Sequence, residues 1–203
     1  MISPFRAYAA LVVAFAAIVA TGAGWSVGSE PTAHFNAFAS FLVLGFLSEA
    51  SYLKLRVERV ETQSSVSFIP FLASVLLFDS GWAASIAAVS VLGVELTVRR
   101  KPFDRALFNT AQVFLSVALA AFAYRALGGT PALERSAFPI EATVAAVAVY
   151  FLVNSTAVSV AVSLGEGIEF TRSWLRIAGG SLFYDLATSL LAPLLAFLYT
   201  RYQ

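Results

Sequence analysis

Four long stretches with almost no charged residue decide what this chain can fold into. Residues 7–29, 106–124 and 142–165 contain no Asp, Glu, Lys or Arg, and residues 177–200 contain only Asp185. A helix needs about 20 mostly apolar residues to cross a lipid bilayer. Charged residues make up 12% of the chain, whereas soluble domains contain about 25%. The sequence therefore predicts an all-α, polytopic membrane bundle.

The spacing of the apolar stretches predicts six or seven transmembrane helices in one integral membrane domain over residues 1–203. We expect helices near 5–24, 33–53, 65–79, 83–98, 106–126, 141–164 and 178–200. The third and fourth are short, and the segment from Phe78 to Trp82 supplies Asp, Ser and Gly for a turn between them. The alternative is a single tilted span with an interfacial extension. The first apolar run resembles a secretory signal, but we interpret it as a retained helix because further spans follow.

The distribution of cations favours the model with seven crossings. With the N-terminus inside, ten Lys and Arg residues fall in inner segments and three in outer segments. Cytoplasmic loops of membrane proteins are enriched in Lys and Arg. Merging the third and fourth helices would place Arg99 to Arg105 outside, against this rule. The expected location is a cytoplasmic membrane, with the C-terminus outside.

The segment 165–177 is too polar to span. Phe170, Trp174 and Ile177 follow helical spacing, while Arg172 and Arg176 fall on another side. This pattern favours a short helix in the cytoplasmic interface, with Trp174 at the depth of the headgroups. A plain loop is the alternative.

Polar residues inside the apolar segments gather near the predicted cytoplasmic ends. In hydrocarbon such groups need partners, which makes each of them a candidate functional or structural residue. The basic loops lie at the same depth, so we expect an acid–amide–arginine network that joins neighbouring helices. A direct role in ligand or proton chemistry is the alternative for the two amides of the fifth helix. The residues of this expected structural network are Glu49, Glu95, Asn109, Gln112, Asn154 and Asp185.

The predicted outer ends carry aromatic residues and a few polar side chains. Such aromatics commonly form a belt at the membrane interface. The alternative is an aromatic pocket for a small organic ligand, with a few polar groups that give selectivity. The candidate ligand-binding residues are Trp25, His34, Asn36, Asp79, Trp82 and Tyr124.

The sequence argues against several classes of function. It contains no cysteine and one histidine, so no thiolate chemistry and no multi-histidine metal site can be built. It contains no HExxH, GxSxG or Walker motif, so no catalytic residue is assigned and an enzyme is not expected. We expect no cofactor, no metal and no nucleic-acid partner.

Several short motifs carry a resemblance to a known family. They are Ser65 to Phe68 at the start of a short helix, the pattern Phe108-Asn109-x-x-Gln112 after a basic turn, Tyr150 to Asn154, and the loop Gly165 to Gly167. Over about residues 39–202 the chain resembles the N-terminal multi-span sensor domains of bacterial signalling proteins. In those proteins a cytoplasmic HD phosphohydrolase or GGDEF cyclase module usually follows.

The resemblance implies a fold and a function. These sensor domains are similar to the substrate-binding subunits of energy-coupling-factor vitamin transporters, which implies a comparable bundle with a pocket toward the outer face. The expected function is a membrane-embedded small-molecule sensor, whose partners are membrane lipid, a small organic ligand, and an output domain or membrane subunit. The alternatives are a substrate-binding subunit of a vitamin-type importer and a structural membrane scaffold without ligand. The chain ends at Gln203, before the further helix and output module of the signalling relatives.

The predicted topology can be tested with cysteines, because the natural chain has none. In intact cells, a membrane-impermeant maleimide should label Ser136→Cys and leave Lys101→Cys unlabelled. Permeabilised cells serve as the control, because both cysteines should react there. Labelling at 101 without labelling at 136 in intact cells would contradict the topology.

Overall fold

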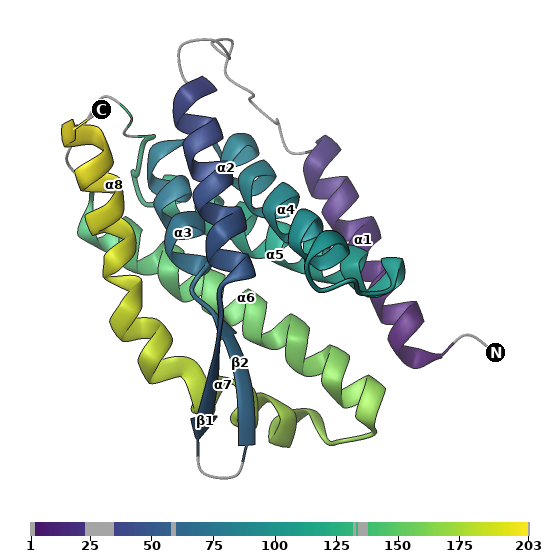
Figure 1. The fold of residues 1–203 in the computed structure, drawn as a ribbon. Coiled ribbons are helices and arrows are strands. Elements are labelled where there is room, and N and C mark those ends of the chain that lie inside the picture. The colour runs from purple at the N-terminus through teal and green to yellow at the C-terminus, as the bar shows by residue number, and fades with distance from the viewer. Residues whose placement is uncertain (1–2, 23–34, 58–59, 132, 134–137, 203) are drawn as a thin grey trace.

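A computed structural model describes residues 3–22, 35–57, 60–131, 133 and 138–202. It is a bundle of helices, as the sequence predicted, with one two-stranded hairpin (Figure 1). The elements in chain order are α1 (Pro4–Gly22), α2 (Phe35–Ala50), β1 (Tyr52–Val57), β2 (Val60–Ser65), α3 (Phe68–Leu77), α4 (Ser80–Thr97), α5 (Phe103–Ala126), α6 (Ile140–Glu166), α7 (Phe170–Ser189) and α8 (Leu191–Tyr202).

Helix α5 is the centre of the bundle. It contacts α4, α6, α1 and α3, and 72% of its apolar span is buried inside the protein. Its continuous apolar sequence is suited to this position, because a helix that is apolar on all sides can be covered by neighbours all round. By length and composition, α1, α4, α5 and α6 could each cross a membrane.

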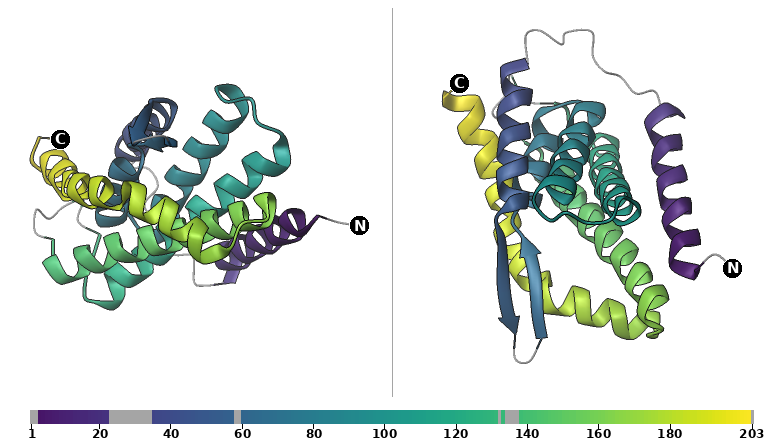
Figure 2. Two further views of the ribbon diagram at one scale, coloured as in Figure 1. Left: turned by 90° about the horizontal axis from the view of Figure 1, so that it is seen from below. Right: turned by 45° about the vertical axis from the view of Figure 1, so that its right-hand side comes forward.

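Helix α1 lies at the edge of the bundle, as the right-hand view of Figure 2 shows. Only 11% of its apolar span is buried. Its buried residues Ala9, Val12 and Ala16 face the core. The rings of Phe5 and Tyr8 lie 5.7 and 5.8 Å from the ring of Phe108 on α5. The Tyr8 hydroxyl also donates to the Ala157 carbonyl of α6 at 3.2 Å. The remaining apolar surface of α1 is suited to contact with lipid.

The segment between α2 and α3 differs from the prediction. Helices were expected at 33–53 and 65–79 with a basic loop between them, but α2 ends at Ala50 and α3 begins at Phe68. Strands β1 and β2 pair antiparallel between these helices, from Tyr52 opposite Ser65 to Val57 opposite Val60. The cause is the alternation of apolar and polar residues from Leu53 to Val57, which has the period of a strand. The hairpin extends beyond the helices at one end of the molecule (Figure 1).

The C-terminal region also differs from the prediction. In place of an interfacial segment at 165–177 and one helix at 178–200, α7 runs from Phe170 to Ser189 and α8 from Leu191 to Tyr202. Pro193 explains the break, because proline lacks an N–H group and its ring clashes with the carbonyl four residues earlier, here that of Ser189. Helix α7 first crosses the end of the molecule near the hairpin and then turns along the bundle (Figures 1 and 2).

Helices α2 and α4 pack so closely at Gly45 that there is no room for a side chain. A Cβ atom at this position would lie 2.7 Å from the Ser90 hydroxyl oxygen and 2.9 Å from the ring of Phe71. The Ser90 hydroxyl donates to the Leu42 carbonyl at 3.3 Å across the same contact. Small residues at such positions let helix backbones approach one another in membranes.

Gly45→Ala should therefore destabilise the protein by about 1–3 kcal/mol, the usual cost of overpacking a core. The measurement is the melting temperature in detergent. Gly165→Ala in α6 is the matched control, because a Cβ atom there meets nothing within 4 Å. Equal melting temperatures for the two variants would contradict the close contact.

Candidate functional site

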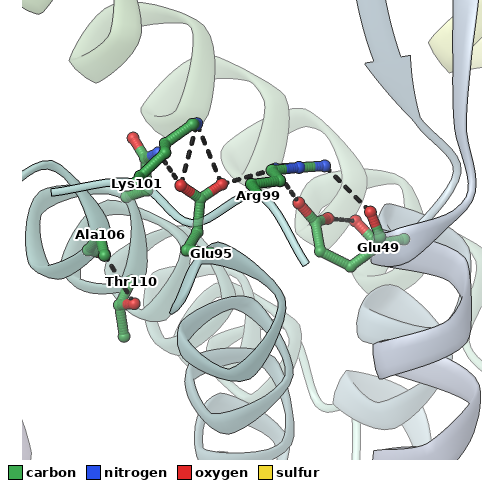
Figure 3. Close-up of polar contacts among 8 residues, drawn as sticks. Glu49, Glu95, Arg99, Lys101, Ala106 and Thr110 are labelled. Carbon is green, nitrogen blue, oxygen red and sulfur yellow. Dashed lines mark hydrogen bonds and ion pairs between the residues drawn. The ribbon is translucent and has the colours of Figure 1, made fainter. Parts of the chain in front are cut away.

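The carboxylate of Glu95, near the end of α4, is the centre of a group of polar contacts. Its side chain is buried, and three groups surround it (Figure 3). Arg99 Nη1 lies 2.6 Å from Glu95 Oε1, Lys101 Nζ lies 2.9 Å from Oε2, and Asn109 Nδ2 on α5 donates to Oε2 at 3.0 Å. Glu95 thus joins the end of α4, the following turn and the first part of α5.

The turn between α4 and α5 brings the two cations to Glu95. Arg100 adopts a left-handed conformation with φ 50°, which a non-glycine residue adopts only when its surroundings hold it there. This conformation folds the chain back, so that the Lys101 N–H donates to the Glu95 carbonyl at 2.9 Å. Pro102 then precedes the first residue of α5.

Arg99 extends the cluster to α2 and to the base of the hairpin. Its Nη1 lies 2.7 Å from Glu49 Oε1, and its Nη2 donates to the Glu49 backbone carbonyl at 2.9 Å. Ser67, just before α3, donates its hydroxyl hydrogen to the other Glu49 carboxylate oxygen. Glu49 continues the buried stripe of α2 that includes Phe41 and Gly45. One side of the cluster therefore holds both the segment that enters the hairpin and the segment that leaves it.

We call Glu49, Glu95, Arg99, Lys101 and Asn109 the inner cluster, in which acidic and basic side chains are equal in number. It contains two carboxylates and two cations. Burial acts to lower the pKa of Arg99, but the charge of Glu49 and the hydrogen bonds and charge of Glu95 outweigh burial and raise it. The pKa of Arg99 therefore lies above its ordinary value, and Arg99 keeps its positive charge beside the two carboxylates.

The opposite end of the bundle holds a separate ion pair. Arg125 Nη2, in the last turn of α5, lies 2.7 Å from Asp79 Oδ1, just before α4. Asp79 makes no side-chain cap to α4, so its carboxylate is used for the contact between helices. Both side chains are about one-third exposed, and the stabilisation from such a pair is small.

Tyr124 lies next to this ion pair along α5 and is 1% exposed. Gly129 packs against its ring so closely that a Cβ atom at Gly129 would lie 2.5 Å from Tyr124 Cε1. The Tyr124 hydroxyl is buried and has no hydrogen-bond partner among the residues that the structure describes. A buried hydroxyl without a partner destabilises the protein by about 1–3 kcal/mol, so this group needs an explanation.

The other candidate ligand-binding residues are dispersed or lie outside the described residues. Trp82 on α4 is half-buried and packs edge-on against Phe38 of α2, with ring centroids 4.8 Å apart. Asn36 is exposed at the start of α2. Trp25 and His34 lie outside the residues that the structure describes. The ion pair with Arg125 holds Asp79 near the end of α5 that carries Tyr124.

The remaining members of the expected polar network do not all join the inner cluster. Gln112 is buried one turn after Asn109, and its Oε1 has no partner within the described ranges. Asn154 is half-buried on α6. Asp185 lies in α7, and its side chain is outside the described part of the chain. The structure thus joins Glu49 to Glu95 through Arg99, and Asn109 donates directly to Glu95.

Sequence reasoning missed the individual partners. The sequence pattern places Arg125 and Asp79 at the same end of the bundle but does not show that they pair. It likewise gives no sign that Ser67 bonds to Glu49. Among the described residues, no three His, Asp or Glu side chains are grouped so that they could hold a metal ion.

Loss of the Glu95 charge should destabilise the protein more than loss of its amide partner. Glu95→Gln removes the carboxylate that Lys101 and Arg99 share and should lower the free energy of unfolding by about 1.5–3 kcal/mol, the contribution of a charged hydrogen bond, because Lys101 is 38% exposed and Arg99 keeps its contact with Glu49. Asn109→Ala removes one hydrogen bond between helices and should lower it by about 0.6–2 kcal/mol. The melting temperatures of the two variants in detergent show which substitution destabilises the protein more.

Asp104→Asn is the control for this comparison. The Asp104 carboxylate is 48% exposed and lies 3.8 Å from Arg6, so its removal should change stability by less than about 1 kcal/mol. If Glu95→Gln melts at the same temperature as Asp104→Asn, the inner cluster does not hold the helices together.

Comparison with known proteins identifies the chain. The family model MASE9, which describes a membrane-associated sensor domain, matches residues 30–203. No match to a curated protein or to a solved structure was found. The matched region includes α2 to α8 and all the residues of the inner cluster. The chain therefore belongs to the MASE9 family of membrane-associated sensor domains.

Proposed function

We propose that this sensor domain binds a small organic molecule in the half of the bundle that contains Tyr124 and Trp82. The observation that carries the proposal is the buried Tyr124 hydroxyl, which has no hydrogen-bond partner among the described residues. A ligand with a hydrogen-bonding group would satisfy this hydroxyl. The neighbouring Asp79–Arg125 pair and the half-buried Trp82 supply the polar and aromatic groups that small-molecule sites combine.

The contacts of the inner cluster support placing the ligand in the half of the bundle that contains Tyr124. Its carboxylates and cations are matched, and Asn109 Nδ2 donates to Glu95. A ligand at this end would have to break ion pairs that are already made. A structural role for the inner cluster and a binding role for the Tyr124 end are therefore consistent with each other.

The proposed orientation places the hairpin, the inner cluster and the start of α7 on the cytoplasmic side. The basis is the excess of Lys and Arg in these segments. Successive helices from α1 to α5 run in opposite directions along the bundle (Figure 1), and α1, α4, α5 and α6 are each long and apolar enough to cross a membrane. The Tyr124 end then faces outward.

The inner cluster suggests how a ligand would act on a cytoplasmic output module. Arg99 connects the α4–α5 turn to Glu49, and Ser67 connects Glu49 to the far side of the hairpin. A ligand that shifted α5 relative to α2 would therefore strain contacts at the base of the hairpin. A ligand can change the output of a sensor only if it binds one arrangement of the helices more tightly than the other.

A substrate-binding subunit of a vitamin-type importer is the second candidate, and it would use the same ligand site. It is favoured by the resemblance to energy-coupling-factor subunits and by the peripheral α1, whose exposed apolar side could contact a membrane partner. Copurification with an ATPase-driven membrane complex would favour this role over sensing. A scaffold without ligand is the remaining alternative.

The ligand site can be tested with Tyr124→Phe, which removes the unpartnered hydroxyl and keeps the ring. Without ligand, this variant should melt at the same or a slightly higher temperature, because a buried group without a partner is removed. A small-molecule extract of the producing cells should raise the melting temperature of the natural protein and should raise that of the variant much less. Tyr199→Phe on α8 is the matched control, because it also removes a tyrosine hydroxyl and keeps the ring.

A shift of equal size in the natural protein and in Tyr124→Phe would place the ligand elsewhere. Absence of any shift with the natural protein over a broad set of extracts would favour the scaffold. A ligand recovered at Glu49 or Glu95 would contradict the choice of half.

A further inference from the structure

Arg99 differs in its contacts from the two arginines near the start of α7. Arg99 is bound within the inner cluster. By contrast, Arg172 and Arg176 are exposed, and neither makes a salt bridge to another residue that the structure describes. The two carboxylates nearest in sequence, those of Glu166 and Glu169, are exposed and make no salt bridge to these arginines, and Glu169 accepts a hydrogen bond from the Thr171 hydroxyl at 2.7 Å.

The two unpaired arginines lie on one side of α7. Residues 172 and 176 are four apart and therefore adjacent on a helix surface. Leu175, between them, is 65% exposed. The opposite side of this part of α7 is packed against the bundle, because Ser173 and Ala178 are buried there. The exposed side, which we call the α7 face, therefore combines two guanidinium groups with an apolar side chain.

The position of this part of α7 agrees with the surface of a membrane. The helix begins at the end of the bundle near the hairpin and first runs across that end (Figures 1 and 2). Helix α6, which is long and apolar enough to cross a membrane, ends at Glu166, just before α7 begins at Phe170. A helix across the ends of spanning helices lies at the depth of the headgroups, where an apolar residue can reach the acyl boundary and arginines can reach phosphates.

We propose that the α7 face binds the headgroups of anionic lipids. Guanidinium groups form paired hydrogen bonds with phosphate oxygens, and an anionic lipid supplies the negative charge that the described residues do not supply to Arg172 and Arg176. Leu175 adds apolar contact with the lipid chains. The membrane is the partner, because the family is membrane-associated. The proposal does not depend on the ligand site near Tyr124.

The test uses the fluorescence of Trp174, which is half-buried within the same turn of α7. Trp25→Phe and Trp82→Phe leave Trp174 as the only tryptophan, since the chain has three. The protein is reconstituted in vesicles of phosphatidylcholine and phosphatidylglycerol in which only one of the two lipids carries bromine, a short-range quencher. We expect stronger quenching when bromine is on phosphatidylglycerol, with a local enrichment of about fivefold for each arginine that reaches a headgroup.

The double variant Arg172→Gln/Arg176→Gln should remove this preference, and Arg201→Gln at the other end of the bundle should retain it. High salt should weaken the preference, because it screens exposed charges. Equal quenching by the two brominated lipids, or a preference that survives in the double variant, would overturn the proposal.

Both leaflets contain both lipids, so the result does not depend on orientation. If the single-tryptophan protein does not fold, native mass spectrometry of the natural protein and the double variant compares how many molecules of each lipid stay bound. Equal retention of phosphatidylglycerol by both proteins would overturn the proposal in that case.

Discussion

Burial of the Glu95 carboxylate is the constraint on which the hairpin end of the bundle depends. Removing a charge from water costs several kcal/mol unless partners replace the water, so the chain must bring cations to this position. It does so with the left-handed turn at Arg100, which presents Arg99 and Lys101 to the same carboxylate. Arg99 then carries the contact on to Glu49 and fixes α2 against α4.

The two ends of the bundle are built differently, which separates structural from binding roles. At the hairpin end, charges are buried and matched, and Asn109 donates to the central carboxylate. At the other end, the ion pair between Asp79 and Arg125 is partly exposed, and the Tyr124 hydroxyl is buried without a partner among the described residues. Matched buried groups hold helices together, whereas an unmatched group is available for a ligand. The amides Asn109 and Gln112 are one turn apart on α5, and Asn109 Nδ2 donates to Glu95 whereas Gln112 Oε1 has no partner within the described ranges.

Most of the fold could be predicted, and the errors have clear causes. The apolar stretches indicated α1, α4, α5 and α6, because a segment of about 20 mostly apolar residues is long enough to cross a membrane as a helix. The hairpin was missed because the apolar stretches before and after it suggested helices that extend into Leu53 and Ser65, although the alternation from Leu53 to Val57 has the period of a strand. The break before Leu191 was missed because Pro193 lies within an otherwise apolar run.

The sequence by itself determined that this is a membrane bundle and that acids, amides and cations gather near one end of its helices. These properties follow from local composition and depth. Only the tertiary structure decided that Arg99 joins Glu49 to Glu95, that Arg125 meets Asp79, and that Tyr124 is buried beneath Gly129. Many cations lie at the right depth for each carboxylate, and the rotation and close packing of the helices select one of them.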